Sequence, residues 1–218
     1  MIHPKPSRLA RAIFNPYIEH LLKKSFTSFY AVNEFPNLSP NKSVLLTPNH
    51  FSWWDGFFID AVSRRFLPNK QFNLLMLEDQ LEQYFFFKYL GCFSINLQKT
   101  SSMIESIKYS RKVLSDNSNL LVVYPQGEIE PYDKPELTLK NGIASMVKGN
   151  EKGTVVLPVG FKIQYDNQQH PDLYVRFGSP MEPEILVRNF TEYINLFTEN
   201  IRLLNEASVK KEFAWKIW

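Results

Sequence analysis

Two residues whose side chains can move a proton, His50 and Asp55, stand five positions apart directly after the short apolar run SVLLTP. A neutral histidine accepts a proton from a hydroxyl group. A carboxylate about one helical turn away can hold the imidazole in the tautomer that leaves its second nitrogen free. Such a pair suits acyl transfer to a hydroxyl group without a covalent intermediate on the protein. No other segment of the sequence pairs a base with an orienting carboxylate in this way.

The segments that must position this pair alternate between strand-like and helix-like patterns. Apolar runs predict strands at residues 43–48, 71–77, 92–95, 119–125, 154–163 and 172–178. Amphipathic spacing and helix-ending residues predict helices at 8–30, 53–66, 78–89 (closed by Gly91), 101–115, 141–148 and 183–210. Strands that alternate with helices favour an α/β fold. We expect a mostly parallel mixed sheet flanked by helices, with an N-terminal amphipathic helical segment.

Functional side chains of such sheets gather in the loops beyond the carboxyl ends of the strands. Asn49 and His50 directly follow the strand at 43–48, and the turn YPQGE at 124–128 lies at the end of the strand at 119–125. The two turns are therefore expected to face one crevice.

Composition narrows the class of protein. The chain has 218 residues, of which 44% are hydrophobic and 22% charged, as in a folded globular protein. Its formal net charge of +3 is too small to indicate a nucleic-acid partner. The single cysteine, Cys92, excludes an internal disulfide and is best interpreted as a buried thiol in a reducing compartment.

A structural interpretation competes with the catalytic one for Asp55. Ser52 followed by Asp55 fits a capping box, in which Ser52 caps a helix and Asp55 reaches back to its amide. Capping does not account for Asn49 and His50 immediately before. The neighbouring pair Trp53 and Trp54 is compatible with a core, membrane-facing or acyl-chain-lining position.

Four sequence blocks in a set order resemble those of the glycerolipid (lysophosphatidic acid) acyltransferase family. NHFSWWD at 49–55 resembles the N-H-x-x-x-x-D block, and GCFSIN at 91–96 resembles the second. YPQGE at 124–128 and LPVG at 157–160 resemble the third and fourth. The resemblance covers roughly residues 40–180. We expect an acyltransferase domain at residues 36–218, after an N-terminal amphipathic, membrane-associating helical segment at 1–35.

The resemblance also implies roles. His50 would take the proton of the acceptor hydroxyl, and Asp55 would orient the imidazole and stabilise its cation. Gly127 would let the backbone approach the reacting groups, with nearby amides as oxyanion donors. An activated acyl donor, acyl-CoA or acyl carrier protein, would be the co-substrate, and no cofactor is expected. Further residues are expected to bind substrate: Asn49, Ser52, Gln126, Gly127, Glu128, Lys99, Lys140 and Pro158. Pro158, with Val159, would shape the acyl or donor pocket, although LPVG equally fits a buried strand.

Departures from the family concern the acceptor. Members that acylate glycerol phosphates usually carry an arginine after the second block and another in the third. Here Leu97 and Ile129 stand at those positions, and Gln126 replaces the usual glutamate. Either Lys99 and Lys140 contact the phosphate as point charges, or the acceptor carries no phosphate there and is a sugar, a glycosylated lipid or another lipid alcohol. Guanidinium groups bind phosphate in a bidentate way, so their loss favours the second explanation.

Basic and aromatic residues at both ends predict contact with a membrane surface. The helix at 8–30 carries Arg8, Arg11, Lys23 and Lys24, and the C-terminal FAWKIW combines tryptophans with a lysine. No apolar run is long enough to span a bilayer, roughly 18–20 residues, and no signal peptide is expected. We therefore expect a peripheral protein on the cytoplasmic face of a membrane. The alternative is that the helix packs onto the domain as part of its core.

Other functions fit less well. A catalytically inactive lipid-binding protein of the same fold stays open because the third block is altered, as does a lysophosphatidic acid acyltransferase of phospholipid synthesis. The sequence has no G-x-S-x-G elbow of a serine hydrolase and no phosphate-loop signature. Its other histidines lack metal-ligand spacing. The oligomeric state stays open.

Overall fold

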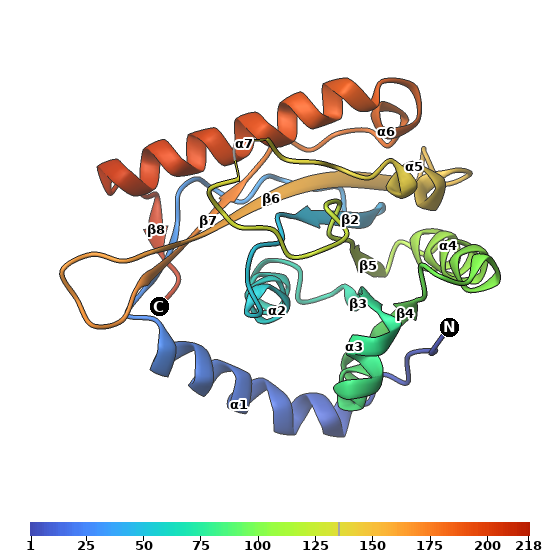
Figure 1. The fold of residues 1–218 in the computed structure, drawn as a ribbon, viewed down its shortest axis with the longest axis horizontal. Helices are drawn as coiled ribbons and strands as arrows, with labels where there is room; N and C mark the ends of the chain where they lie inside the picture. The colour runs from blue at the N-terminus through green and yellow to red at the C-terminus, as the bar shows by residue number, and fades with distance from the viewer. Residues whose placement is uncertain (135) are drawn as a thin grey trace.

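One mixed sheet organises the molecule in the computed structural model, which describes residues 1–134 and 136–218. The sheet has eight strands in the order β4-β3-β5-β2-β6-β7-β1-β8 (Figure 1). The strands are β1 (Phe29–Ala31), β2 (Ser43–Pro48), β3 (Gln71–Leu77), β4 (Cys92–Ile95), β5 (Asn119–Val122), β6 (Thr154–Gln164), β7 (Asp172–Phe177) and β8 (Trp215–Lys216).

Strand β2 lies among five parallel strands, between β5 and β6. All six of its residues are buried, as expected for a strand covered on both faces. Strand β6 runs on beyond the end of β2, since Pro48 pairs with Val159 and β6 continues to Gln164. Strand β7 then returns antiparallel to β6. The end of β2 is therefore flanked by a longer neighbour, which offers backbone groups to the turn that follows.

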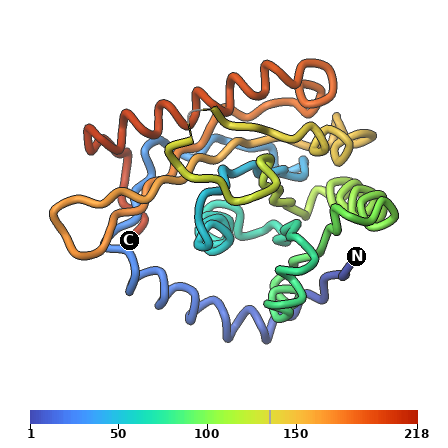
Figure 2. The backbone as a smooth tube through the Cα atoms, viewed as in Figure 1, coloured from blue at the N-terminus to red at the C-terminus, as the bar shows by residue number. Residues whose placement is uncertain are grey.

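Helices cover both faces of the sheet (Figures 1 and 2). One face packs against α1 (Arg8–Ser25), α2 (Asp55–Phe66), α3 (Glu78–Gln83) and the 3₁₀ helix η1 (Phe85–Leu90). The other packs against α4 (Thr100–Leu114), α5 (Gly142–Val147), α6 (Glu184–Arg188) and α7 (Phe190–Lys210). The alternation of side chains along β2 separates the two cores, because Val44 and Leu46 face the first layer and Leu45 the second. This architecture confirms the predicted fold class.

Two features of the N-terminal region differ from prediction. The helix expected at 8–30 ends at Ser25, because Phe26 is extended and residues 29–31 form β1 beside β7 and β8. Tertiary pairing here overrides the helical spacing. Residues 29–31, which lie before the boundary expected between residues 35 and 36, thus belong to the sheet.

Helix α1 is itself tied to that unit. The guanidinium group of Arg11 forms an ion pair with the buried Asp60 of α2 and donates a hydrogen bond to the carbonyl oxygen of Leu90. Ile18 and Leu22 of the same helix are buried in the core. The inner face of α1 therefore packs onto the domain, as one of the two alternatives from the sequence predicted.

Two long helices expected from sequence are each divided. The helix at 78–89 becomes α3 followed by η1, and Gly91 ends η1 in the left-handed conformation (φ 99°), as predicted. Only a glycine fits there, because a Cβ would lie 2.2 Å from the carbonyl oxygen of Phe72. The helix at 183–210 is interrupted at Asn189, whose side chain accepts a hydrogen bond from the amide of Glu192 and begins α7.

The C-terminal tryptophans contact the core of the protein, and their contact with a membrane stays a prediction. Trp215 and Trp218 pack against the first core layer, and Trp218 stacks edge-on against Phe29. They close the edge of the sheet. In the described residues no helix is both long and apolar enough to cross a bilayer.

Candidate active site

The turn after β2 is shaped by the side chain of Asn49. Its amide oxygen accepts a hydrogen bond from the backbone N–H of Phe161 (2.7 Å), and its amide nitrogen donates to the carbonyl of the same residue (3.0 Å). Asn49 thus satisfies the backbone of β6 where β2 has ended. The chain leaves the sheet there, which carries His50 to the carboxyl edge of β2.

His50 and Asp55 are in contact. Nδ1 of the imidazole lies 2.8 Å from Oδ2 of Asp55, which also accepts hydrogen bonds from the amides of Phe51 (2.7 Å) and Ser52 (2.9 Å). The capping role and the orienting role are therefore held by one carboxylate. An ionised carboxylate only accepts hydrogen bonds, so Nδ1 carries the proton and Nε2 is the basic nitrogen.

The two side chains have different access to solvent. The side chain of His50 is 22% exposed, whereas that of Asp55 is fully buried. Burial raises the pKa of Asp55, and the hydrogen bonds from His50 and the two amides partly offset that effect. The imidazole of His50 is thus accessible to solvent, while the carboxylate that orients it, Asp55, is buried.

Tyr124 supports the imidazole from the loop that follows β5. Its ring stacks on that of His50 with the centroids 4.2 Å apart. Its hydroxyl group is buried, and burial together with the charge of Asp55 holds the pKa of Tyr124 well above its ordinary value. The tyrosine is therefore a neutral surface that fixes the plane of the imidazole.

The third-block turn contacts the first block directly. The amide oxygen of Gln126 accepts a hydrogen bond from the backbone N–H of His50 (2.6 Å), and its amide nitrogen donates to the carboxylate of Glu130 (2.8 Å). The backbone N–H of Glu130 in turn donates to the carbonyl oxygen of His50 (3.0 Å). The two turns expected to face one crevice are thus hydrogen-bonded to each other.

Gly127 occupies a position that a side chain would obstruct. Its φ is +77°, and a Cβ there would lie 2.8–3.1 Å from the Lys140 side chain, which covers it. Its amide donates to the carbonyl of Tyr124 (3.0 Å) and is therefore committed to the turn. Within the described residues the amides of Glu128 and Ile129 carry no hydrogen bond, which makes them candidates for oxyanion donors.

The remaining predicted residues lie at different distances from the imidazole. The Lys140 ammonium is 3.9 Å from Glu128, beside the third block. Lys99 is exposed at the start of α4, beyond β4, which is three strands from β2 and so roughly 14 Å to the side. Pro158 is buried in β6 opposite Thr47, with its ring against Gly178. The hydroxyl of Ser52 accepts a hydrogen bond from the amide of Trp54.

The two tryptophans of the first block separate. Trp53 is 53% exposed, whereas Trp54 packs edge-on against Phe26 in the core. Trp54 also lines a cavity of about 430 Å³ between the end of α1 and the β6–β7 hairpin, together with residues such as Leu21 and Ile163. Its lining mixes apolar side chains with polar ones such as Lys24 and His170, and it begins beside the first block.

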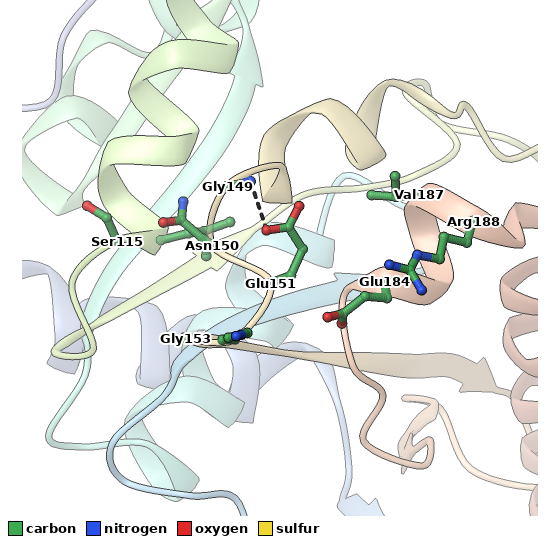
Figure 3. Close-up of a pocket in the computed structure, with 10 residues that line it drawn as sticks. Ser115, Gly149, Asn150, Glu151, Gly153, Glu184, Val187 and Arg188 are labelled. Atoms are coloured by element: carbon green, nitrogen blue, oxygen red, sulfur yellow. Dashed lines mark hydrogen bonds between the residues drawn. The ribbon is translucent and has the colours of Figure 1, made fainter.

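A second cavity, of about 490 Å³, lies far from this chemistry. It is lined by the loop 149–153, by Ser115 and by Glu184, Val187 and Arg188 of α6 (Figure 3). Ser115 precedes β5, and the loop 149–153 precedes β6. The cavity therefore lies at the amino edge of the sheet, opposite His50. The candidate proton-transfer groups, His50 and Asp55, lie at the opposite, carboxyl edge.

Sequence reasoning missed two residues that contact the base. Tyr124 belongs to the third block in the sequence, and its stacking on His50 follows only from the structure. Glu130 has no sequence signal of its own, because its contact with Gln126 forms only where residues 126–130 fold against the first block.

The fold and the site together define an α/β protein with a histidine–carboxylate pair at the carboxyl edge of its sheet. The sequence profile of the Acyltransferase family matches residues 30–162, more than half of the chain. The crystal structure of the 1-acyl-sn-glycerophosphate (LPA) acyltransferase PlsC from Thermotoga maritima is similar with a TM-score of 0.60. The two share 15% sequence identity over 88% of this chain and 79% of that one. No curated protein sequence matches this chain.

The chain belongs to the acyltransferase family and is an acyltransferase enzyme. The family predicted from the four sequence blocks is thereby confirmed.

Proposed function

We propose that the protein is an O-acyltransferase that moves a fatty acyl group from an activated donor to the hydroxyl group of a lipid. The observation that carries the proposal is the imidazole of His50, exposed at the carboxyl edge and held at Nδ1 by the buried Asp55. The donor is an acyl thioester of coenzyme A or of acyl carrier protein.

The proposed reaction has no covalent enzyme intermediate. Nε2 of His50 takes the hydroxyl proton while the acceptor oxygen attacks the thioester carbonyl carbon. The amides of Glu128 and Ile129 stabilise the resulting oxyanion, and Asp55 stabilises the imidazolium. Collapse of the tetrahedral intermediate breaks the carbon–sulfur bond. The leaving thiolate receives the proton from His50, which restores the base.

The test is turnover of acyl thioesters with a panel of lipid acceptors, measured as the release of free thiol. Turnover that needs both an acceptor and His50 supports the enzyme. If no acceptor yields thiol, the protein is a lipid-binding member of the family that has lost activity. Mass spectrometry of the lipids that accumulate when the protein is removed identifies the acceptor.

The acceptor is proposed to lack a phosphate near the third block. Leu97 and Ile129, at the positions where family members carry arginines, are 44% and 53% exposed, so apolar side chains face solvent there. Lys140 is close to the turn but lies near the carboxylate of Glu128, which reduces its value to a phosphate. A sugar, a glycosylated lipid or another lipid alcohol fits this surface better than a glycerol phosphate.

Replacing Lys140 with alanine tests this proposal. With the preferred acceptor, KM is expected to change by less than about threefold, because one exposed lysine is worth little. The matched control is Lys152→Ala, on the loop at the amino edge. KM is measured for phosphate-free and phosphate-bearing acceptors. A selective rise of about tenfold for lysophosphatidic acid, with that lipid as the best wild-type substrate, would establish the glycerol phosphate reaction instead.

Peripheral membrane binding, proposed for the cytoplasmic face, rests on the outer face of α1. Leu9, Ile13 and Tyr17 are exposed at successive intervals of four residues, with Lys24 exposed at the end of the helix. Such a row of apolar side chains beside basic residues suits the interface of an anionic bilayer.

Changing this row is expected to release the protein from vesicles. The triple variant Leu9→Ser, Ile13→Ser and Tyr17→Ser should bind anionic liposomes about tenfold or more weakly, because three apolar side chains leave the lipid. Its matched control changes three exposed apolar residues on α6 and α7, across the sheet: Val187→Ser, Leu196→Ser and Val209→Ser. Equal cosedimentation of the two variants would remove α1 as the contact. Truncation is unsuitable, since residues 1–30 include most of β1.

A further inference from the structure

The peptide of His50 is clamped by a side chain from another loop. Gln126 is buried, and its amide oxygen lies 2.6 Å from the backbone nitrogen of His50. Its amide nitrogen lies 3.3 Å from the carbonyl oxygen of His50 and 2.8 Å from Oε2 of Glu130. One amide group therefore contacts both backbone polar groups of the residue that carries the base.

With a carboxylate at position 130, the group at position 126 must both donate and accept hydrogen bonds. The backbone N–H of His50 requires an acceptor, whereas the carboxylate of Glu130 requires a donor. A glutamine offers one oxygen and one NH₂ group and satisfies both. A glutamate at position 126 would place its second oxygen against the carboxylate of Glu130 and against the carbonyl of His50, with a proton on neither unless one is taken up.

Glu130 is also held in place by several contacts, as Gln126 is. It is buried, its carboxylate is paired with Lys134, and its backbone N–H donates to the carbonyl of His50 (3.0 Å). Hydrogen bonds from Lys134 and Gln126 lower the pKa of Glu130, to which Lys140 adds a smaller effect. Gln126 stands where family members usually carry a glutamate. An ionised carboxylate is instead present four residues later, at Glu130, and it accepts a hydrogen bond from Gln126.

We propose that Gln126 and Glu130 are a matched pair of positioning residues that fix the backbone of His50 and so aim its imidazole. The proposal rests on the proposed function for its catalytic consequence. The third block of this chain then works through an amide at 126 and an acid at 130, and neither side chain needs to touch substrate. A carboxylate at 126 is compatible with this site only when position 130 gives up its own.

The pair makes a pH-dependent prediction for Gln126→Glu. Two carboxyl groups about 3 Å apart hold one proton between them, so one of them has a raised pKa. The folded state of this variant keeps that proton at low pH and loses stability as pH rises through the raised pKa. Lys134 and Lys140 act on the same carboxylates and reduce the shift, and the His50–Asp55 pair lies on the other side of the turn. In Gln126→Glu/Glu130→Gln the pH-dependent loss should disappear.

The experiment compares wild type, Gln126→Glu, Glu130→Gln and the exchanged double variant at pH 6 and pH 8. We expect Gln126→Glu to lose about tenfold in kcat at pH 8 relative to pH 6, beyond the change in wild type, with KM little altered. Its unfolding temperature should fall over the same range. The exchanged variant should recover both quantities at pH 8 to near the values of Glu130→Gln, which retains the contact through a neutral amide.

Two results would overturn the pairing. One is wild-type kinetics and stability of Gln126→Glu at both pH values. The other is an exchanged variant no better than Gln126→Glu in unfolding temperature, whether or not the single variant folds well. Absence of turnover in wild type would count against the proposed function alone, because the unfolding temperatures still report on the pair.

Discussion

Replacing His50 with alanine should lower kcat by about 10²–10⁴, the usual contribution of a positioned general base. The ring is the exposed member of the pair, and its Nδ1 is committed to Asp55, so the base is Nε2. Binding of the acyl donor should change little, because the imidazole is required in the transition state.

Loss of the imidazole also leaves the buried Asp55 short of one donor, at a cost of about 1–3 kcal/mol. His50→Gln separates the two effects, since an amide NH₂ can still donate to Asp55 without acting as a base. We expect both variants to be inactive and the glutamine variant to unfold at the higher temperature. The measurements are thiol release and thermal unfolding. Retention of most of the activity by either variant would exclude His50 as the base.

Replacing Asp55 with asparagine should give the second large effect, a loss of about 10³–10⁴ in kcat. The amide can present its NH₂ group to Nδ1 of His50, which then becomes the acceptor and places the proton on Nε2. The base is thereby blocked while the shape of the site is kept. The atom that faces Nδ1 of His50 is Oδ2, which also accepts hydrogen bonds from the amides of Phe51 and Ser52, so an NH₂ group in its place gives up both of these hydrogen bonds.

Stability should respond differently from activity. Burial raises the pKa of Asp55, so the folded state holds this proton more tightly than the unfolded chain does. The contribution of the group to stability is complete below its ordinary pKa of 3.8 and is lost as pH rises through the raised pKa. Each unit of raised pKa corresponds to about 1.4 kcal/mol.

Asparagine does not titrate, so the free energy of unfolding of Asp55→Asn should gain on wild type as pH rises through this window and then stay constant. Denaturant unfolding from acid to neutral pH measures the difference. A difference that shrinks with rising pH would mean that the pKa of Asp55 is lowered in the fold. A variant that keeps wild-type kcat would remove Asp55 from the mechanism.

Much of the architecture was predictable because it depends on local patterns. Apolar runs located the strands of the parallel core, and the left-handed position at Gly91 followed from helix-ending rules. The spacing of His50 and Asp55 predicted their contact because both lie in one turn. The family followed from block order alone.

What could not be predicted depends on contacts between distant segments. The end of α1 is set by the pairing of β1 with β7, more than 140 residues away. The fit of Gln126 to the peptide of His50 spans 76 residues, and the stacking of Tyr124 depends on β5 lying beside β2. Burial of Asn49, Gln126 and Pro158 likewise gives them framework positions in the structure, where similarity alone suggested contact with substrate.

The ion pair between Arg11 and Asp60 has a consequence for how acceptors are chosen. It joins the helix proposed to rest on lipid to the helix whose first residue is Asp55, so the two cannot swing independently. If α1 rests on a bilayer as proposed, we expect the imidazole to be held at one fixed distance from the plane of the headgroups. Acceptors whose hydroxyl group lies at that distance should then be acylated in preference to those with shorter or longer headgroups.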